Sequence, residues 1–520
     1  MSDNERPPSA PLSRRKLLAA GALGAAGVIA GGLAIGHQGQ ARPPARPATE
    51  PLPSPSGGDA APATAPLRAG GALRRITLTA APATVDLAGR RAATWTYGNG
   101  ATGPEIRVRR GDTLAVTVTN RLPDPTTVHW HGLAIRNASD GVPGLTQPAI
   151  APGARYTTSF VVPDAGTYWY HSHHGVQLDR GLYGPLVVED PDDPGADLDR
   201  VIVLDDWLDG LGATPDAVLG GLGGAPGMAG MHGAAHAGQG AVPSGLLPPA
   251  PMISSALGGL AGHIAYPLHL LNGRPPADRH TFRAGPGDRV RLRLINAGSD
   301  TAYRFAVGGH ELTVTHADGW RVEPVTVPTL IIGMGERYDV TVTVRSGAWP
   351  VYAAAEGKPG GAAAVLRTTD AAVRSAPPAG TRPGELAREP LAYDRLRPAA
   401  HTTLAGRDPD REFRMFLTGS MGKAGVAGAW QLAGDTAMRV HKGERVRITV
   451  VNYSEVFHPM HLHGHTFAVA GPGTRRDTVT VLPGQALGID FDATNPGAWM
   501  YHCHNTYHTA MGMMATLTYR

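Results

Sequence analysis

The residues best suited to chemistry gather near the C-terminal end of this sequence. The stretch 458–465 contains four histidines, and residues 501–504 read Tyr-His-Cys-His. Cys503 is the only cysteine, so it cannot form a disulfide bond within the chain. A thiolate beside imidazoles is a soft ligand set of the kind that favours copper. The stretch therefore predicts a copper site, against the alternative of an inert buried thiol.

Histidines separated by one residue form four pairs that share no member: His129 and His131, His171 and His173, His461 and His463, and His502 and His504. Residues two apart in a β-strand point to the same face, so each pair can present two imidazoles to one side. Eight imidazoles are too many for one ion. Two pairs lie in each of two distant regions, so we expect these regions to meet and to hold several copper ions between them.

A second site is expected on the other face of the strand that carries Cys503. The Cys503 sulfur should point away from His502 and His504, because neighbouring residues of a strand face opposite sides. His458 precedes His461 by an odd offset and should also face away from the pairs. A blue electron-transfer copper typically has two histidines, one cysteine and a weak axial methionine. The residues that fit this set are Cys503, His458, His508 and Met513.

Two patterns that must position these residues repeat along the chain. A Gly-Asp or Gly-Glu turn leads into an alternating strand at 111–120, 287–296 and 443–452. Alternation predicts one buried and one solvated face for each strand. A second pattern leads through aromatic residues into the histidines at 171–173 and 502–504, and its middle copy at 347–352 runs into alanines instead.

These repeats predict an all-β protein of three sandwich domains, at residues 69–198, 199–378 and 379–520. The 69 glycines and 46 prolines separate short runs rich in valine, threonine and leucine, as is typical of such folds. Only the first and third domains carry histidine clusters. The Pro/Gly-rich stretch 376–384 is expected to be a linker.

The N-terminus is typical of an exported protein. Residues 13–18 read Ser-Arg-Arg-Lys-Leu-Leu, and an uncharged run follows to Gly36. We expect residues 1–41 to be a twin-arginine export signal, and 42–68 to be a disordered Pro/Ala linker. The predicted location is the periplasm, the cell envelope or the outside, and an uncleaved membrane anchor is the alternative. The net charge of +4 gives no reason to expect nucleic-acid binding.

From about residue 70 onwards the sequence resembles three-domain multicopper oxidases of the laccase type, and especially bacterial cuprous oxidases. The resemblance rests on the four histidine pairs and the His-Cys-His motif. It implies three cupredoxin-like Greek-key β-sandwiches and four copper ions per chain. The implied ligands are a type 1 (blue) set of His458, Cys503, His508 and Met513, a type 2 set of His129 and His461, and a type 3 set of His131, His171, His173, His463, His502 and His504. His174 and His465 match no ligand position.

The family's chemistry would then follow. Four one-electron oxidations at the blue copper are coupled to reduction of dioxygen to water at the other three ions. Oxygen reduction consumes protons, so a carboxylate is expected near the cluster. Asp140 stands where the family often places one, although a plain turn aspartate before Gly141 is the alternative. Many laccase-like members also carry a carboxylate at the position of Thr509, so this departure leaves the proton route open.

The reductant is predicted to be Cu(I), as in copper detoxification, or small phenols and aromatic amines. The segment 208–262 contains thioether and imidazole groups that suit Cu(I): Met228, Met231, His232, His236 and Met252. The alternative is a flexible loop in which these residues are incidental. Met511 and Met514 beside Met513 could extend the same soft surface or belong to the core.

Two other functions compete with the oxidase. A copper nitrite reductase needs no type 3 pair, so the full set of eight histidines argues against it. A periplasmic copper-binding or scaffold protein on the same fold would be expected to lack some ligands, and none is missing. Partners are therefore predicted to be dioxygen, Cu(I) or small phenols, and the twin-arginine export machinery. Three domains can complete the cluster within one chain, so we expect a monomer.

Overall fold

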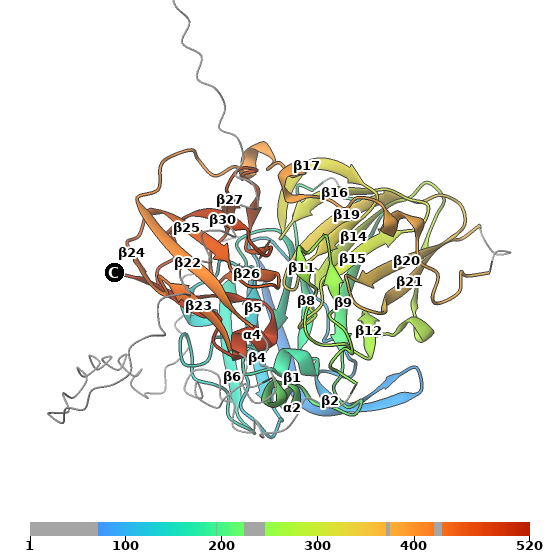
Figure 1. The fold of residues 1–520 in the computed structure, drawn as a ribbon, viewed down its shortest axis with the longest axis horizontal. Coiled ribbons are helices and arrows are strands. Elements are labelled where there is room, and N and C mark those ends of the chain that lie inside the picture. The colour runs from blue at the N-terminus through green and yellow to red at the C-terminus, as the bar shows by residue number, and fades with distance from the viewer. Residues whose placement is uncertain (1–70, 194, 223–244, 371–374, 421–428) are drawn as a thin grey trace, which may run out of the picture. The chain divides into compact units, whose positions relative to one another are not determined.

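Regular structure in this protein is almost entirely β-strand, and pairs of sheets form three sandwiches that follow one another along the chain. A computed structural model describes residues 71–193, 195–222, 245–370, 375–420 and 429–520. In Figure 1 the sandwiches can be followed by colour, from blue and cyan through green and yellow to orange and red. This arrangement confirms the predicted all-β class.

The first sandwich has two four-stranded sheets, with strand orders β2-β1-β4-β6 and β3-β8-β7-β5. Its strands are β1 (Leu73–Leu87), β2 (Arg90–Tyr97), β3 (Ile106–Arg109), β4 (Thr113–Asn120), β5 (His129–His131), β6 (Arg155–Val161), β7 (Gly166–His171) and β8 (Tyr183–Glu189). Two short 3-10 helices accompany them, η1 (Asn137–Ser139) and η2 (Gln177–Arg180).

The second sandwich has a six-stranded sheet, β12-β9-β14-β19-β16-β17, and a five-stranded sheet, β13-β21-β20-β15-β18. Its strands are β9 (Leu198–Trp207), β12 (Leu268–Leu271), β13 (His280–Ala284), β14 (Arg289–Asn296), β15 (Tyr303–Val307), β16 (Leu312–Ala317), β17 (Trp320–Val327), β18 (Leu330–Ile332), β19 (Arg337–Thr343), β20 (Ala348–Ala355) and β21 (Gly361–Thr368). Between β9 and β12 lie the helix α2 (Pro215–Gly221) and a hairpin of β10 (Ile253–Ser254) and β11 (Gly259–Leu260).

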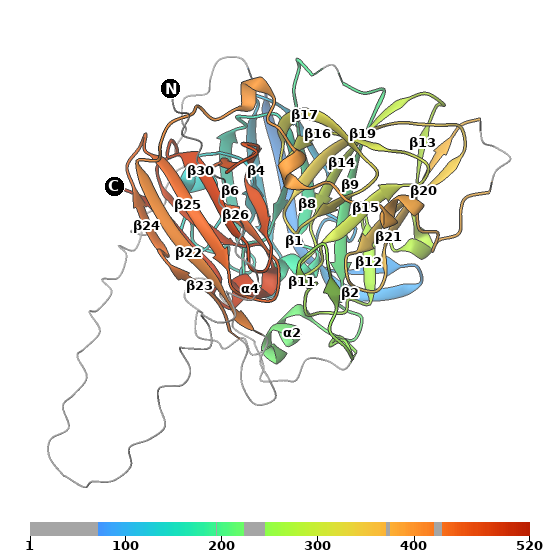
Figure 2. The same cartoon turned by 45° about the horizontal axis from the view of Figure 1, so that its top comes forward.

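The third sandwich follows three 3-10 turns, η5 (Gly384–Ala387), η6 (Tyr393–Arg395) and η7 (Ala400–Thr402). Its sheets have the orders β23-β22-β25-β30-β27-β28 and β24-β32-β31-β26-β29. The strands are β22 (Arg411–Ser420), β23 (Ala429–Gly434), β24 (Ala437–Val440), β25 (Arg445–Asn452), β26 (His458–Leu462), β27 (Phe467–Val469), β28 (Arg475–Arg476), β29 (Thr478–Val481), β30 (Ala486–Asp492), β31 (Ala498–Cys503) and β32 (Met514–Tyr519). The helix α4 (Thr506–Ala510) follows β31, and Figure 2 shows β22, β25 and β30 side by side.

The sequence repeats correspond to a repeated topology. The Gly-Asp or Gly-Glu turns precede β4, β14 and β25, and each of these strands pairs in parallel with the first strand of its sandwich, β1, β9 or β22. The leading glycines, Gly111, Gly287 and Gly443, have φ angles of 89°, 89° and 93°. These angles lie in the left-handed region, which only glycine enters without strain. The three sequence repeats therefore mark the same parallel strand pairing in each of the three sandwiches.

One expectation about these strands is wrong. Alternate burial holds for β4 and β25, but every residue of β14 after Arg289 is buried. The face of β14 that was expected to be solvated carries Arg291 and Arg293, which pair with carboxylates of neighbouring strands and loops. Arg293 also donates to the hydroxyl of Thr167 in the first sandwich, at 3.0 Å. This face is covered because another sandwich packs on it.

The proposed export signal and linker, at residues 1–41 and 42–68, lie outside the described residues. Within the described ranges, no helix has the length and apolar character needed to cross a bilayer. The stretch 376–384, where a linker was expected, comes after β21 and ends at Gly384, the first residue of η5. Each sandwich has its own apolar core, and the core of the third sandwich includes Cys503 and Met513.

Candidate metal centre

The side chains of His458, Cys503 and His508 meet in the core of the third sandwich. The Sγ atom of Cys503 lies 3.5 Å from Nδ1 of His458 and 3.7 Å from Nδ1 of His508. The two Nδ1 atoms lie 3.1 Å apart. All three side chains are buried, so two imidazole nitrogens and one sulfur converge on a point shielded from water. We call this group the thiolate centre.

Local structure explains why these atoms converge. His458 begins β26, and the Ser454 hydroxyl lies 2.7 Å from its Nε2 atom, which leaves Nδ1 facing the sulfur. His508 lies in α4, whose first turn is capped by Asn505: its side-chain oxygen accepts from the backbone N–H groups of Tyr507 and His508. The backbone N–H of Asn505 donates to the Cys503 sulfur at 3.4 Å. A short capped helix therefore fixes the second imidazole.

Met513 and Trp430 complete the surroundings of the thiolate centre. Met513 is fully buried in the same core, its N–H donates to the carbonyl of His508, and its carbonyl accepts from the N–H of Cys503. The Trp430 ring stacks on the His508 ring at 4.0 Å between centroids. Trp430 could not be predicted from the sequence, because β23 and α4 are far apart in the chain and meet only through packing.

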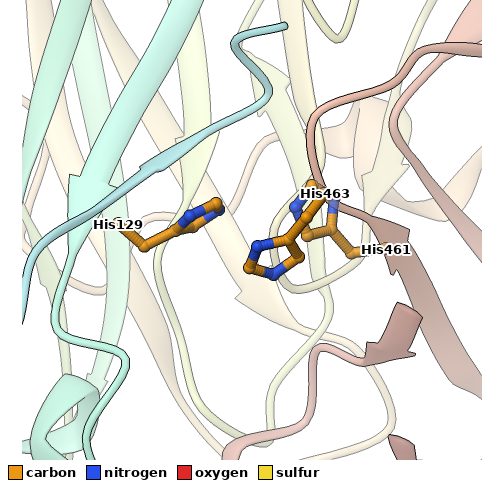
Figure 3. A group of neighbouring side chains, drawn as sticks. All are labelled: His129, His461 and His463. Carbon is orange, nitrogen blue, oxygen red and sulfur yellow. The ribbon is translucent and has the colours of Figure 1, made fainter. Parts of the chain in front are cut away.

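The four histidine pairs meet in a second group, which we call the histidine cluster. The β5–β7 register sets His129 opposite His171, and the β26–β31 register sets His461 opposite His502. Rings of the first and third sandwiches stack on one another, His129 on His463 at 3.9 Å and His131 on His461 at 3.8 Å. Figure 3 shows His129 approaching from one side, with His461 and His463 on the other.

The strand argument for these pairs holds in only one case. His129 and His131 both lie in β5, whereas the second members of the other pairs, His173, His463 and His504, come just after their strands end. The rings of each pair nevertheless face the same cluster, with centroids between 4.8 and 6.0 Å apart. Three of the four pairs therefore face the cluster through the residues that directly follow a strand, and not through strand alternation.

Hydrogen bonds on the outside of the cluster aim two imidazoles inwards. His129 donates from Nδ1 to the carbonyl of Asp140 at 2.8 Å, and His461 donates from Nδ1 to the carbonyl of Asp477 at 2.9 Å. The opposite nitrogen of each ring, Nε2, is buried and has no hydrogen-bond partner in the described part of the chain. A buried nitrogen without a hydrogen bond lowers the stability of the fold unless another group binds it, and a metal ion bound at that nitrogen would remove this cost.

The remaining six histidines form two groups of three. One contains His173, His463 and His502. The Nε2 atom of His502 lies 3.0 Å from Nε2 of His463 and 3.5 Å from Nε2 of His173. The other has ring centroids 4.9 to 5.7 Å apart and consists of His131, His171 and His504. Four ring nitrogens of this group have no hydrogen-bond partner among the residues that the structure describes: both nitrogens of His504, Nε2 of His171 and Nδ1 of His131.

The electrostatics of both groups suit a metal. Burial lowers the pKa of His458 to about 3, and burial together with neighbouring histidines lowers the pKa of His463 and His502 well below the ordinary value. These imidazoles are therefore neutral, as metal ligands must be. Burial raises the pKa of the Cys503 thiol, and a bound metal ion would reverse this by removing the proton outright. The donor set of one sulfur and many imidazoles fits copper.

Asp140, the expected carboxylate, lies against the histidine cluster. Its Oδ2 atom is 3.1 Å from Nδ1 of His463, and its Oδ1 atom is 3.3 Å from Nδ1 of His129. The Asp140 side chain is buried, and the residue caps the C-terminal end of η1. Asp140 therefore contacts one histidine of the predicted type 2 set and one of the predicted type 3 set.

A second carboxylate at the cluster, Asp477, was not predicted. It contacts His131 Nε2 at 3.2 Å and His461 Nδ1 at 3.5 Å. Burial raises the pKa of Asp477, but Arg337 of the second sandwich outweighs burial, and the net pKa is below its usual range. The two side chains form a doubly hydrogen-bonded pair at 2.6 and 2.5 Å. The sequence signal that could have identified Asp477 is a comparison of the two His-X-His-Gly motifs. The motif at 129–132 is followed by Asp140, and the motif at 461–464 is followed by Asp477.

Thr509, at the position where a carboxylate was expected, donates a short hydrogen bond to the carbonyl of Cys503. It also borders a cavity of about 30 Å³ against the cluster, lined in part by His171, His173, His502 and His504. This volume holds one or two molecules the size of water or dioxygen. Thr509 therefore lies where small molecules can reach the cluster, but it brings no ionisable group.

The methionines and histidines expected on a soft surface, and His465, lie elsewhere than in the two ligand groups. Met228, Met231, His232 and His236 lie outside the described residues. Met252 is buried in the core of the third sandwich, so it belongs to the packing rather than to a soft surface. Met511 is partly buried and packs against the same core. His465 donates from Nδ1 to the carbonyl of His463, and its Nε2 lies 2.6 Å from the Tyr519 hydroxyl, away from the ligand groups.

Comparisons with known proteins point the same way. Models of the family described as multicopper oxidase match residues 79–193, 254–373 and 399–520. The chain is 44% identical to multicopper oxidase MmcO of Mycobacterium tuberculosis (strain ATCC 25618 / H37Rv) over 85% of this chain and 86% of that protein. It is 28% identical to a copper resistance protein A homolog of Pseudomonas syringae pv. tomato, over 84% of this chain and 90% of that one.

Among solved structures, the chain is similar to a laccase from Botrytis aclada, with a TM-score of 0.69 and 25% sequence identity. The match covers 86% of this chain and 88% of the laccase. Such neighbours have the cupredoxin fold, so the predicted three cupredoxin-like sandwiches are confirmed.

Proposed function

The chain belongs to the multicopper oxidase family, and on that premise we propose how its residues divide the work of an oxidoreductase that uses dioxygen as electron acceptor. Neither a nitrite reductase nor a non-oxidase copper protein is favoured, because all eight cluster histidines and the cysteine are present and buried. The four ions of the proposed cofactor divide between the thiolate centre and the histidine cluster.

The thiolate centre is proposed to hold the type 1 copper and the histidine cluster the other three ions. The observation that carries this proposal is the set of buried, unpartnered ring nitrogens, of which Nε2 of His129 and of His461 are the clearest. The type 1 ligands are His458, Cys503, His508 and Met513; the type 2 ligands are His129 and His461; the two type 3 groups are His131, His171 and His504, and His173, His463 and His502. Copper in these sites would supply one-electron oxidation at the sulfur and four-electron reduction of dioxygen at the cluster.

The chain itself provides the link between the two sites. Cys503 lies between His502 and His504, so a few covalent bonds connect the thiolate centre with both type 3 groups. The Nδ1–H of His502 donates to the carbonyl of Cys503 at 2.8 Å, which adds a second, shorter connection. Electrons taken up at the sulfur reach the cluster through this segment of β31.

Protons are proposed to come from the carboxylate side of the cluster. Asp140 accepts from His463 and lies within reach of His129, so it can hold or release a proton beside both. Asp477 is the less suitable donor, because its ion pair with Arg337 keeps it ionised. We therefore assign the proton-transfer role to Asp140 and a positioning role to Asp477.

Cu(I) is proposed as the main reductant, with phenols and aromatic amines as slower ones. His508 is 1% exposed, and the rings of Trp430 and His263 lie within 4.0 and 5.8 Å of it, so a bulky phenol cannot reach its ring edge directly. The Pseudomonas relative is named for copper resistance, which supports the same choice. Export by the twin-arginine route to the periplasm or cell envelope, and a monomeric state, complete the proposal.

The test is oxygen uptake by the copper-loaded protein, with stabilised Cu(I) and a substituted phenol as separate reductants. Faster uptake with Cu(I) supports a copper-detoxifying oxidase, and faster uptake with the phenol would contradict that choice and make the protein a general laccase. Copper analysis of the same sample should find about four ions per chain, whereas a single or variable number would contradict the ligand assignment. No uptake with either reductant from such a sample would overturn the proposed oxidase sites.

A further inference from the structure

We propose that Asp300, in the second sandwich, positions the loop of the thiolate centre and tunes its reduction potential through Asn505. The inference rests on the proposed function, because it takes the thiolate centre as the type 1 copper site. Among the described residues, none of the proposed copper ligands comes from the second sandwich. Its contribution to the blue copper would therefore be indirect.

Asn505 controls two features of the thiolate centre at once and connects them to Asp300. Its backbone N–H donates to the Cys503 sulfur at 3.4 Å. Its side-chain oxygen caps α4 by accepting from the N–H groups of Tyr507 and His508, at 3.1 and 3.2 Å. Its side-chain amide then donates to Oδ1 of Asp300 at 2.7 Å. A shift of Asn505 would move the sulfur's hydrogen bond and the helix that carries His508 together.

Asp300 is a rigid acceptor for that amide. Its other oxygen, Oδ2, accepts from Lys358 Nζ at 2.6 Å and from the backbone N–H groups of His263 and Ile264 at 2.9 and 3.0 Å. The side chains of Asp300 and Lys358 are 2% and 1% exposed. A buried carboxylate with this many donors has one low-energy orientation. The neighbouring backbone adds a further contact, from the N–H of Thr506 to the carbonyl of Ser299.

The hydrogen bond to sulfur gives this contact a redox consequence. Hydrogen bonding around the cysteine sulfur tunes the potential of a blue copper site. A donor to the thiolate withdraws negative charge from it, which disfavours Cu(II) relative to Cu(I). Loosening Asn505 should therefore leave more charge on the sulfur and lower the reduction potential.

Asp300→Asn is the direct test, because it keeps the shape but leaves one acceptor oxygen. Two fixed backbone N–H groups donate to the Oδ2 position, so the one remaining oxygen should stay on that side. The new side-chain NH2 group of Asn at position 300 then faces the side-chain NH2 group of Asn505, and the two donors cannot hydrogen-bond to each other. We expect the blue absorption band to persist with an altered electron-spin resonance signature. The reduction equilibrium of the centre should shift by about tenfold, which corresponds to a fall of ~59 mV for one electron.

Two further variants keep the test decisive. Asp300→Asn with Lys358→Met removes the buried ammonium that the single variant would leave without its carboxylate. It also keeps the net charge near the thiolate centre unchanged, so its fall in potential reports the lost hydrogen bond and not the lost charge. Asp339→Asn is the matched control: this carboxylate of the same sandwich is equally buried, and its partner Arg293 keeps a second carboxylate, Asp199. The control should leave the potential unchanged.

An unchanged potential in folded, blue Asp300 variants would overturn the inference alone. An equal shift in the Asp339→Asn control would also overturn it, because the effect would then come from general loosening of the second sandwich. A copper-loaded wild-type protein without a blue band would overturn the proposed copper set, and the inference with it.

Discussion

The thiolate centre and the histidine cluster share strand β31, yet they are built in different ways. The thiolate centre takes all its proposed ligands from one sandwich, between His458 and Met513. The cluster joins two sandwiches, and its supporting contacts connect residues as far apart in sequence as His131 and Asp477, 346 positions. One site depends on local strand and helix geometry, and the other depends on how separate sandwiches pack.

Their surroundings differ in the same sense. The thiolate centre lies in an apolar core with Trp430 stacked on one imidazole. The cluster lies beside two carboxylates, one of which is paired with a buried arginine from the second sandwich. This contrast implies that substitutions can damage one site while sparing the other, and four predictions test it.

The largest effect should come from Cys503→Ser. Loss of the thiolate removes the intense blue absorption and abolishes oxidase activity, because electrons no longer enter. The cluster ligands are untouched, so copper analysis should show a loss of one ion per chain. A surviving blue band would show that the ligand assignment is wrong.

Asp477→Asn should damage the cluster and spare the thiolate centre. Removing one partner of a buried ion pair leaves Arg337 without its main partner and costs about 3–5 kcal/mol of unfolding free energy. Lost support of His131 and His461 should weaken cluster copper binding by roughly 10–100-fold. Denaturant unfolding and copper retention on dialysis measure the two effects.

The control for this prediction is Asp490→Asn. Asp490 pairs with Arg447 at a partly exposed site, so its loss should cost less than about 1 kcal/mol. Equal destabilisation by the two variants, or loss of the blue copper from the Asp477 variant, would contradict the division between the sites.

Asp140→Asn should slow oxygen reduction by roughly 100-fold or more, the usual contribution of a positioned proton donor. Reduction of the blue copper should keep its rate, because Asp140 lies at the cluster and not at the thiolate centre. Stopped-flow measurement of the two half-reactions separates them. Wild-type rates in both would reduce Asp140 to a turn residue.

The smallest effect is expected from Met513→Leu. The variant should stay blue, since the cysteine and both histidines remain, and its reduction potential should rise because a weak axial ligand is lost. A change of about tenfold in the reduction equilibrium, ~59 mV, is the expected scale. An unchanged or lowered potential in a redox titration would remove Met513 from the site.

The sequence was sufficient to predict the features that depend on short-range order. The repeated Gly-Asp turns and alternating runs predicted three all-β sandwiches, and the structure has them. The spacing of His-X-His and His-Cys-His predicted which side chains gather, although strand alternation accounts for only one pair, His129 and His131 in β5. These inferences needed only neighbours within about ten positions.

Packing decided what local order could not. The alternating pattern of β14 did not reveal that its arginines are covered by the first sandwich, and nothing near Asp477 in the sequence pointed to Arg337, 140 positions earlier. Trp430 and Asp300 likewise reach the thiolate centre only in the folded chain. The sequence therefore determined which histidines and which cysteine could gather, whereas the tertiary structure decided how they face one another and which charges and rings hold them in place. The physical reason is that burial and charge pairing depend on which surfaces meet, and local periodicity carries no record of the opposite surface.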